Sequence, residues 1–265
     1  MTHAACVPAL LLVLAALPAQ AAAPVTLAAH HARYELTLAS VQGGSTVAAS
    51  GSMTYQVIDA CNGWATQQQL RLRTVSRDGG ATDLVSDYAT LEAKDGRHLT
   101  FKIKQIADGT VAEQVSGEAM MRASGGGRIR YTLPHPEIVA LPPGTLFPMA
   151  HTAAIIRSAR GGQKSLSVPL FDGTGTDGAQ DTYVTILGWH AAPSASDHPA
   201  LAALGSSRVI VAFFARGPQT ITPDYASTMR YFDNGVADHV LMDFGGFTMR
   251  ATLTNLVIAN PAAHC

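Results

Sequence analysis

Charge is scarce in this 265-residue chain, because Lys, Arg, Asp and Glu together make up only 14% of it, whereas ordinary soluble domains contain about 25%. The 18 basic and 19 acidic residues nearly cancel and leave a formal net charge of −1. Lys and Arg are scattered along the chain and form no basic cluster. The composition therefore argues against a nucleic-acid-binding protein, which needs a basic surface patch.

Long hydrophobic runs are also missing after residue 21, since no segment there reaches the length of a transmembrane helix, about 18 consecutive apolar residues. The first 21 residues contain no Asp, Glu, Lys or Arg, include an apolar stretch at residues 9–17 and end in the pattern A-x-A. A short apolar stretch followed by this pattern indicates a signal peptide over residues 1–21. We therefore expect an exported mature chain, residues 22–265, with no transmembrane segment.

Cysteine is nearly absent, with three residues in the whole chain. Cys6 lies in the predicted signal peptide, so the mature chain is expected to keep only Cys61 and Cys265. Cys6 is not expected to be lipidated, because it precedes the apolar stretch and a lipidated cysteine would follow it. In an oxidising compartment two such cysteines most simply form one disulfide, although two separate buried thiols are the alternative. A bridge would close a loop of about 200 residues, worth roughly 5 kcal/mol by loop-closure entropy. No C-x-x-C pattern indicates a redox-active thiol.

Alternation of apolar and polar residues dominates the rest of the chain and predicts β-strands with one buried face. The clearest alternating runs are residues 34–38, 69–73, 99–104, 128–133 and 247–254. Hairpin-type turn signals separate such runs at residues 43–44, 62–63, 78–80, 95–96, 108–109, 234–235 and 245–246. The pattern predicts an all-β protein with a strongly coiled antiparallel sheet, a spiral or open cylinder of about 13 to 14 strands.

One segment carries helix signals. Pro148 suits a first helical turn, Arg157 and Arg160 suit a last turn, and Gly161 suits a C-cap, which together predict one short helix over residues 149–160. A second segment without strand signals, residues 191–205, is rich in small and polar residues and predicts a mobile surface loop. The expected bridge would tie together the strands before and after the helix. We therefore expect residues 22–265 to form a single domain.

Motifs that would signal a cofactor or a metal fail on their context. Residues 173–178 match G-x-G-x-x-G, but the strand-like run at 181–187 follows where a dinucleotide site needs a helix. Residues 243–245 spell D-F-G without the other kinase motifs. The ten histidines show no metal-binding spacing, and neither H-E-x-x-H nor G-x-S-x-G occurs. The sequence predicts no cofactor, no metal site and no enzyme.

His151 and the two tryptophans, Trp64 and Trp189, could each have either a functional or a structural role. His151 lies in the first turn of the predicted helix, where a buried, hydrogen-bonded structural histidine is the stronger interpretation. Trp64 and Trp189 lie in strand-rich segments and suit a core better than a sugar-binding platform. An enzyme acting on envelope polymers remains an alternative, centred on His151, Asp172 or Asp243.

Several short motifs occur in a characteristic order along the chain. They are H-A-R-Y-E-L at 31–36, C-N-G-W at 61–64, Glu92 and Gly96 ahead of Phe101, F-P and H-T at 147–152, F-D-G at 171–173, Y-F-D-N-G-V at 231–236, L-M-D-F-G at 241–245 and the last residue, Cys265. This order resembles the EipB cell-envelope-integrity family of periplasmic proteins, long catalogued as a domain of unknown function. The resemblance covers nearly all of residues 22–265.

The resemblance implies a periplasmic antiparallel β-spiral or open cylinder with a disulfide between Cys61 and Cys265. It also implies a role in maintaining the cell envelope, with no established enzymatic activity. The chain departs from the family pattern at Leu91, where a Trp is expected, and at Gly246, where an acidic residue is expected. The change at Leu91 weakens any aromatic site there, and the change at Gly246 weakens a charged feature beside Asp243.

We therefore expect a non-catalytic periplasmic protein that supports envelope integrity by binding an envelope component or a protein partner. The candidate binding residues are Trp64, His151, Asp172, Tyr231, Asn234 and Asp243. The alternative is a periplasmic lipid or lipoprotein carrier. Residues 209–214, V-I-V-A-F-F, favour it because a strand that is apolar on both faces suits an apolar cavity, which the helix at 149–160 would gate.

Overall fold

A computed structural model describes residues 24–217, 222–259 and 265. The predicted signal peptide, residues 1–21, lies outside the described residues. Fourteen strands form one sheet, and each hydrogen-bonded pair of neighbours is antiparallel. The strands are β1 (His30–Val41), β2 (Thr46–Asp59), β3 (Gly63–Ser76), β4 (Ala81–Ala93), β5 (His98–Ala107), β6 (Thr110–Met121), β7 (Gly127–Leu133), β8 (Glu137–Leu141), β9 (Ser165–Leu170), β10 (Gln180–Ile186), β11 (Ser206–Phe214), β12 (Tyr225–Phe232), β13 (Ala237–Asp243) and β14 (Phe247–Ile258).

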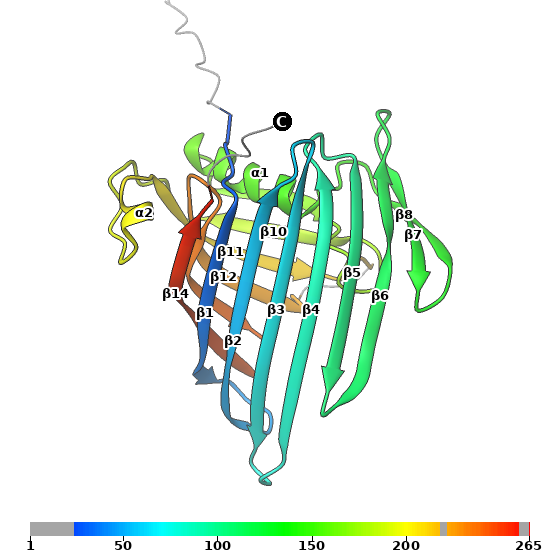
Figure 1. Cartoon of the computed structure of the whole chain (residues 1–265), viewed down its shortest axis with the longest axis vertical. Coiled ribbons are helices and arrows are strands. Elements are labelled where there is room, and N and C mark those ends of the chain that lie inside the picture. The colour runs from blue at the N-terminus through cyan, green and yellow to red at the C-terminus, as the bar shows by residue number, and fades with distance from the viewer. Residues whose placement is uncertain (1–23, 218–221, 260–264) are drawn as a thin grey trace, which may run out of the picture.

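The first strand, β1, lies near the middle of the sheet. β1 pairs with β2 on one side and with the last strand, β14, on the other, and β8 and β9 form the two edges. Figure 1 shows β2 to β6 running side by side in front, while β10 to β12 cross behind them at a steep angle. The sheet therefore coils over itself as an open cylinder, which confirms the predicted fold class.

The turn signals in the sequence lie where the chain reverses. Each of the seven predicted turns connects two strands that pair in the sheet. Asp108 and Gly109 both have positive φ, 49° and 79°, in the tight connection between β5 and β6. Asn and Gly tolerate such values better than branched residues do, which is why Asn-Gly and Asp-Gly pairs mark hairpins in a sequence.

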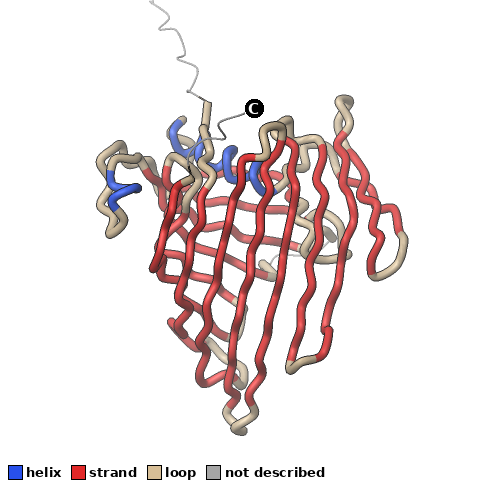
Figure 2. The backbone as a smooth tube through the Cα atoms, viewed as in Figure 1, coloured by secondary structure: helices blue, strands red, loops and turns tan. Residues whose placement is uncertain are grey.

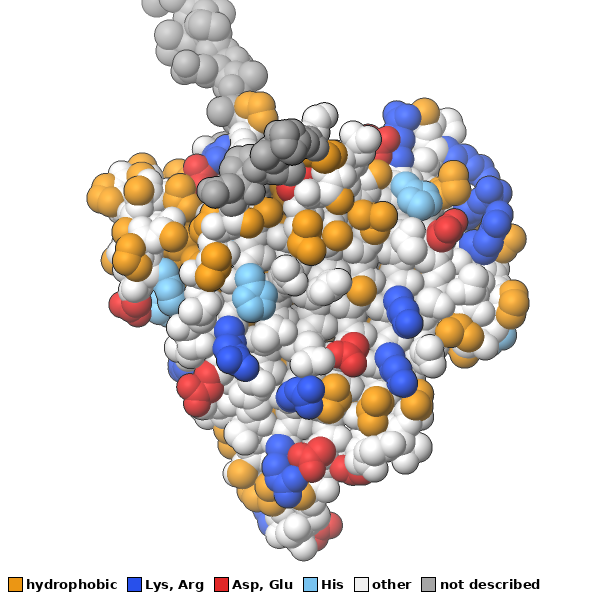
Figure 3. Space-filling view, in the orientation of Figure 1, with side chains coloured by type: hydrophobic (Ala, Val, Ile, Leu, Met, Phe, Trp, Pro, Cys, Tyr) orange, Lys and Arg blue, Asp and Glu red, His pale blue; other side chains and the backbone are white. Residues whose placement is uncertain are grey.

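Period-two burial places the core between the two crossing halves of the sheet. On β1 the side chains of Ala32, Tyr34 and Leu36 are buried, whereas those of Arg33 and Glu35 are exposed. The outer face of the front strands carries mostly uncharged polar side chains with scattered charges (Figure 3). Uncharged polar residues such as Ser, Thr and Gln therefore provide a solvated outer face, so the folded chain needs few charged residues on this surface.

The helix α1 (Pro148–Arg160) lies across one open end of the cylinder (Figures 1 and 2). Its range agrees with the predicted helix, with Pro148 in the first turn and Gly161 as the C-cap. The residue before it, Phe147, offers no side-chain hydrogen bond to the first turn. The apolar side of α1 faces inward, and Ile155 and Ile156 are buried. Neither helix formed by the described residues has the length and hydropathy needed to cross a membrane.

The expectation of only one helix was wrong. A second, four-residue helix, α2 (Pro199–Ala202), forms within residues 191–205. Leu201 is fully buried and packs in the same core cluster as Phe232, so this segment is anchored instead of forming a free surface loop. Four residues are too few to show a helical period in a sequence.

The disulfide joins Cys61 to Cys265, with their Cα atoms 5.4 Å apart. It ties the turn between β2 and β3 to the last residue of the chain. The predicted pairing is therefore confirmed, and the β2–β3 turn is covalently linked to residue 265.

Candidate functional site

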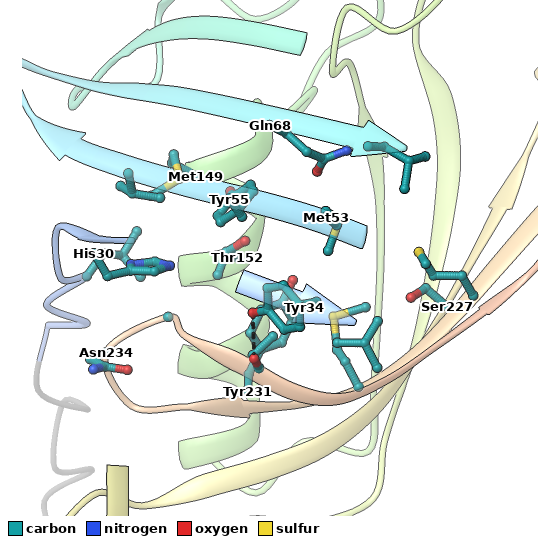
Figure 4. A pocket seen from close by; sticks show the side chains of 18 of the residues that line it. His30, Tyr34, Met53, Tyr55, Gln68, Met149, Thr152, Ser227, Tyr231 and Asn234 are labelled. Carbon is teal, nitrogen blue, oxygen red and sulfur yellow. Dashed lines mark hydrogen bonds between the residues drawn. The ribbon is translucent and has the colours of Figure 1, made fainter. Parts of the chain in front are cut away.

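A cavity of about 320 Å³ lies between the two crossing halves of the sheet (Figure 4). Its walls come mainly from β1, β2 and β3 on one side and from β12 and β13 on the other, while α1 contributes to one end. This volume falls in the range of small-molecule sites, about 300 to 1,000 Å³. Four tyrosines and four methionines dominate the lining: Tyr34, Tyr55, Tyr225, Tyr231, Met53, Met149, Met229 and Met242.

Strand periodicity brings these side chains together. Met53, Tyr55 and Val57 occupy alternate positions of β2 and therefore share its inner face. The alternate positions of β12 likewise project inward and carry Tyr225, Ser227, Met229 and Tyr231. Because methionine side chains are flexible and polarisable, this lining can adapt to an apolar ligand of irregular shape.

No described residue that lines the cavity is an Asp, Glu, Lys or Arg. The titratable groups there are also neutral near pH 7. Burial lowers the pKa of His30, although a hydrogen bond to the Ala28 backbone opposes this, and burial raises the pKa of Tyr225 to about 12. The pKa values of Tyr34, Tyr55 and Tyr231 are raised as well, mainly by burial. The cavity is therefore free of formal charge.

A few polar groups interrupt the apolar lining. His30 Nδ1 lies 2.8 Å from the Ala28 carbonyl oxygen, which can only accept, so Nδ1 carries the proton and Nε2 is left as an acceptor. The Tyr34 hydroxyl donates to the Ala237 carbonyl at 2.8 Å. The Gln68 carboxamide has no hydrogen-bond partner among the described residues. Gln68 lies opposite Tyr55 on the neighbouring strand, and the Tyr55 and His30 ring centroids are 5.8 Å apart.

The helix α1, which borders one end of the cavity, is anchored at both of its own ends. At its start, Glu92 on β4 accepts hydrogen bonds from the backbone N–H groups of Met149 and Ala150, at 2.7 and 2.8 Å. Glu92 is buried, and this burial raises its pKa to about 7, while the two backbone hydrogen bonds oppose the rise. At the end of the helix, Arg160 forms an ion pair with Asp233.

The other end of the cavity opens beside a string of aromatic rings. Phe213, Tyr225, Phe244 and Phe247 contact one another in that order, with centroid separations of 5.5, 5.6 and 5.2 Å. Tyr225 and Phe244 also line the cavity, and Phe244 is 39% exposed. The cavity therefore reaches the surface at this aromatic mouth, the four residues named here.

The structure brings two of the six candidate binding residues to the cavity, Tyr231 and Asn234. The Asn234 side-chain oxygen accepts a hydrogen bond from the backbone N–H of Val236 at 3.2 Å and so stabilises the turn between β12 and β13. The Tyr231 hydroxyl interacts with Thr152 of α1. These two residues therefore join the helix and the turn to the cavity wall.

The other four candidates lie elsewhere and do not line this cavity. Trp64 carries the Lys94 ammonium 4.6 Å from its ring centroid. His151 is buried, its Nε2 lies 3.1 Å from the Thr182 hydroxyl oxygen, and burial lowers its pKa to about 4. Asp172 and Asp243 each accept a hydrogen bond from a backbone N–H two residues further on. No described group of three or more His, Cys, Asp or Glu residues is arranged to hold a metal ion.

Sequence reasoning missed most of the cavity. His30, Tyr55 and Gln68 were not candidates. Tyr55 and two methionines of the lining, Met53 and Met229, nevertheless follow the period of two of their strands. The available signal was the alternation of large apolar and aromatic residues on inward positions of two strands far apart in the chain. That signal is indistinguishable from an ordinary core until the crossing of the strands is known.

Comparison with known proteins agrees with this architecture. The family model for EipB-like proteins matches residues 21–260, a range that contains all fourteen strands and both helices. The chain belongs to the EipB-like family. It is 26% identical over 246 residues to "Cell envelope integrity protein EipB" of Brucella abortus (strain 2308), covering 91% of this chain and 87% of that protein.

A solved relative has the same fold. The crystal structure of a beta-barrel-like protein of a domain of unknown function from Brucella abortus superposes with a TM-score of 0.80 at 27% sequence identity. The match covers 89% of this chain and 100% of the other chain. The open cylinder described for this family member is therefore shared with the solved relative.

Proposed function

We propose that this family member is an exported, non-catalytic protein that supports cell-envelope integrity by binding an apolar envelope component in its cavity. The observation that carries this proposal is a charge-free, largely apolar cavity in a chain whose curated relative is named a cell envelope integrity protein. The disulfide supports export, since such bonds persist in oxidising compartments such as the periplasm. We propose residues 1–21 as the signal peptide and residues 22–265 as a single periplasmic domain.

Binding accounts for the site better than catalysis does. His151 is buried against Thr182 and is neutral near pH 7, because burial lowers its pKa to about 4. Asp172 and Asp243 are each engaged in a local turn. Among the described residues, no hydrogen bond or ion pair joins any two of these three side chains, so they form no acid-base pair or nucleophile-base pair.

Deletion and complementation test this function. The deletion strain is expected to lose tolerance to detergents and to cell-wall antibiotics, and the wild-type gene is expected to restore it. Met53→Trp fills the cavity and should not restore tolerance, whereas Thr54→Trp, the matched change at the next residue of β2, lies on the outer face and should restore it. Equal protein amounts are checked by immunoblot. Full rescue by Met53→Trp would count against cavity binding.

A second candidate, a periplasmic lipid or lipoprotein carrier, is favoured by the methionine-rich lining and the aromatic mouth. Because α1 is held at both of its ends, we assign ligand access to this mouth and not to movement of the helix. Native mass spectrometry of protein purified without detergent is expected to show a co-purifying lipid. A spectrum of ligand-free protein alone, from cells with an intact envelope, would oppose the carrier function.

A further inference from the structure

We infer that the cavity selects a single acyl chain that ends in an uncharged ester, amide or hydroxyl group, and rejects the same chain ending in a carboxylate. This inference rests on the proposed function, because it specifies the ligand of the same cavity. It concerns free lipids, since His30 lies at the end of the cavity away from the aromatic mouth.

The first argument is charge. No cation lines the cavity among the described residues, so an ionised carboxylate would be buried there without a partner. A fatty acid would have to bind in its protonated form. For a carboxyl with an ordinary pKa of about 4.3, that form is less than about a thousandth of the total near pH 8. A neutral head group carries no such penalty.

The second argument is the placement of hydrogen-bonding groups. His30 Nε2 is a lone acceptor, and the Gln68 carboxamide is both a donor and an acceptor without a partner among the described residues. Tyr55 lies between these two side chains on β2 and links them into one polar strip across three adjacent strands. An ester, amide or hydroxyl group can satisfy both ends of this strip.

The third argument is orientation. Figure 4 shows His30 and Asn234 at the end of the cavity near α1, and Ser227 at the opposite end, toward the mouth. A head group bonded to His30 would therefore lie deep inside, with its tail running past Gln68, Met229 and Met242 toward Phe244. A chain attached to a protein cannot enter in this direction, so this arrangement favours a free lipid over a lipoprotein.

Displacement of the neutral fluorescent probe N-phenylnaphthylamine from the purified, oxidised protein tests this inference. At about pH 8, 1-decanoylglycerol is expected to displace the probe at a concentration at least about ten-fold lower than decanoate, which has the same chain length. Gln68→Leu should weaken binding of 1-decanoylglycerol by about ten-fold without weakening binding of the apolar probe, because it removes polar groups but keeps the volume. Gln67→Leu, at the neighbouring outward-facing position, is the matched control and should change neither.

The outcomes separate the two proposals. If decanoate competes as well as 1-decanoylglycerol near pH 8, the inference about a neutral ligand is wrong while cavity binding stands. Equal loss of affinity in the Gln68→Leu and Gln67→Leu variants would also overturn it. If neither the probe nor either lipid binds to a protein that shows a cooperative unfolding transition, the proposed function fails together with the inference.

Discussion

Glu92 on β4 and Met149 on α1 are joined by a hydrogen bond that spans 57 positions of the chain, in which the Met149 backbone N–H donates to Glu92 Oε2 at 2.7 Å. The N–H of Ala150 donates to the other carboxylate oxygen. Ordinarily a Ser, Thr, Asp or Asn at the start of a helix satisfies these donors locally, but Phe147 has no side-chain oxygen. A strand carboxylate thus caps α1 and holds it over one end of the cavity.

The first prediction concerns pH and Glu92. Burial raises its pKa from 4.5 to about 7, so the folded protein binds more protons than the unfolded chain between these values. The contribution of Glu92 to the free energy of unfolding is therefore fully present below about pH 4.5, falls as pH rises, and levels off above about pH 7. Urea unfolding should show that the wild type loses about 3 kcal/mol of stability relative to Glu92→Gln as pH rises across this range. Glu118→Gln, at an exposed strand position, is the control, and a difference for Glu92→Gln that stays constant with pH would contradict the prediction.

The second prediction concerns the disulfide between Cys61 and Cys265. Reduction of the unfolded protein should add the mass of two hydrogens. Cys265→Ser should lower the free energy of unfolding by up to about 5 kcal/mol, because the unfolded chain regains the freedom of a long closed loop. Cys61→Ser should have the same effect, and the double variant should lose no more than either single one. Unchanged urea midpoints in the single variants would show that the bond is dispensable for stability.

The third prediction concerns the ion pair between Arg230 and Asp238. Two hydrogen bonds join the side chains, at 2.7 and 2.5 Å, and their exposed fractions are only 17% and 8%. Asp238→Ala leaves the Arg230 guanidinium without its carboxylate and should lower the free energy of unfolding by about 3 kcal/mol. The control is Asp83→Ala, which breaks the exposed pair with Arg73 and should cost less than about 1 kcal/mol. Equal losses in the two variants, measured by urea unfolding, would refute the expected difference.

The fourth prediction concerns Gly173, in the loop that connects β9 to β10. Its φ is +77°, and an added Cβ would lie 2.4 Å from Phe101 Cγ, inside the aromatic cluster with Phe171. Gly173→Ala therefore combines backbone strain with overpacking. Gly79→Ala, at φ +87° with no atom within 4 Å of the added Cβ, has the strain alone. The loss of stability at Gly173 should exceed that at Gly79 by about 2 kcal/mol in urea unfolding, and similar losses would contradict the overpacking.

Local patterns predicted most of the fold. The alternation in residues 34–38 and 247–254 predicted two strands correctly, because burial of one face depends only on neighbouring positions along the chain. It did not predict that these two strands pair with each other, since β1 and β14 are separated by nearly the whole chain. The α2 helix was missed for a related reason, because its place depends on burial of Leu201 against the core.

The candidate site was predicted only in part. Tyr231 and Asn234 stood out through their motif, and both line the cavity. His30 and Gln68 carry no motif, and their interest arises from being polar and neutral inside an apolar cavity. Asp172 drew attention as a carboxylate in a conspicuous loop, but it serves that loop by accepting hydrogen bonds from Thr174.

By itself, the sequence determined the low charge, the strand period, the turn positions and the pairing of Cys61 with Cys265. These features follow from composition and from contacts between near neighbours. Only the tertiary structure decided that the sheet coils over itself, that the inner faces of β2 and β12 enclose a charge-free cavity, and that Glu92 caps α1. The reason is that enclosure depends on which strand faces meet across the sheet, and a local period cannot specify a meeting between residues so far apart in the chain.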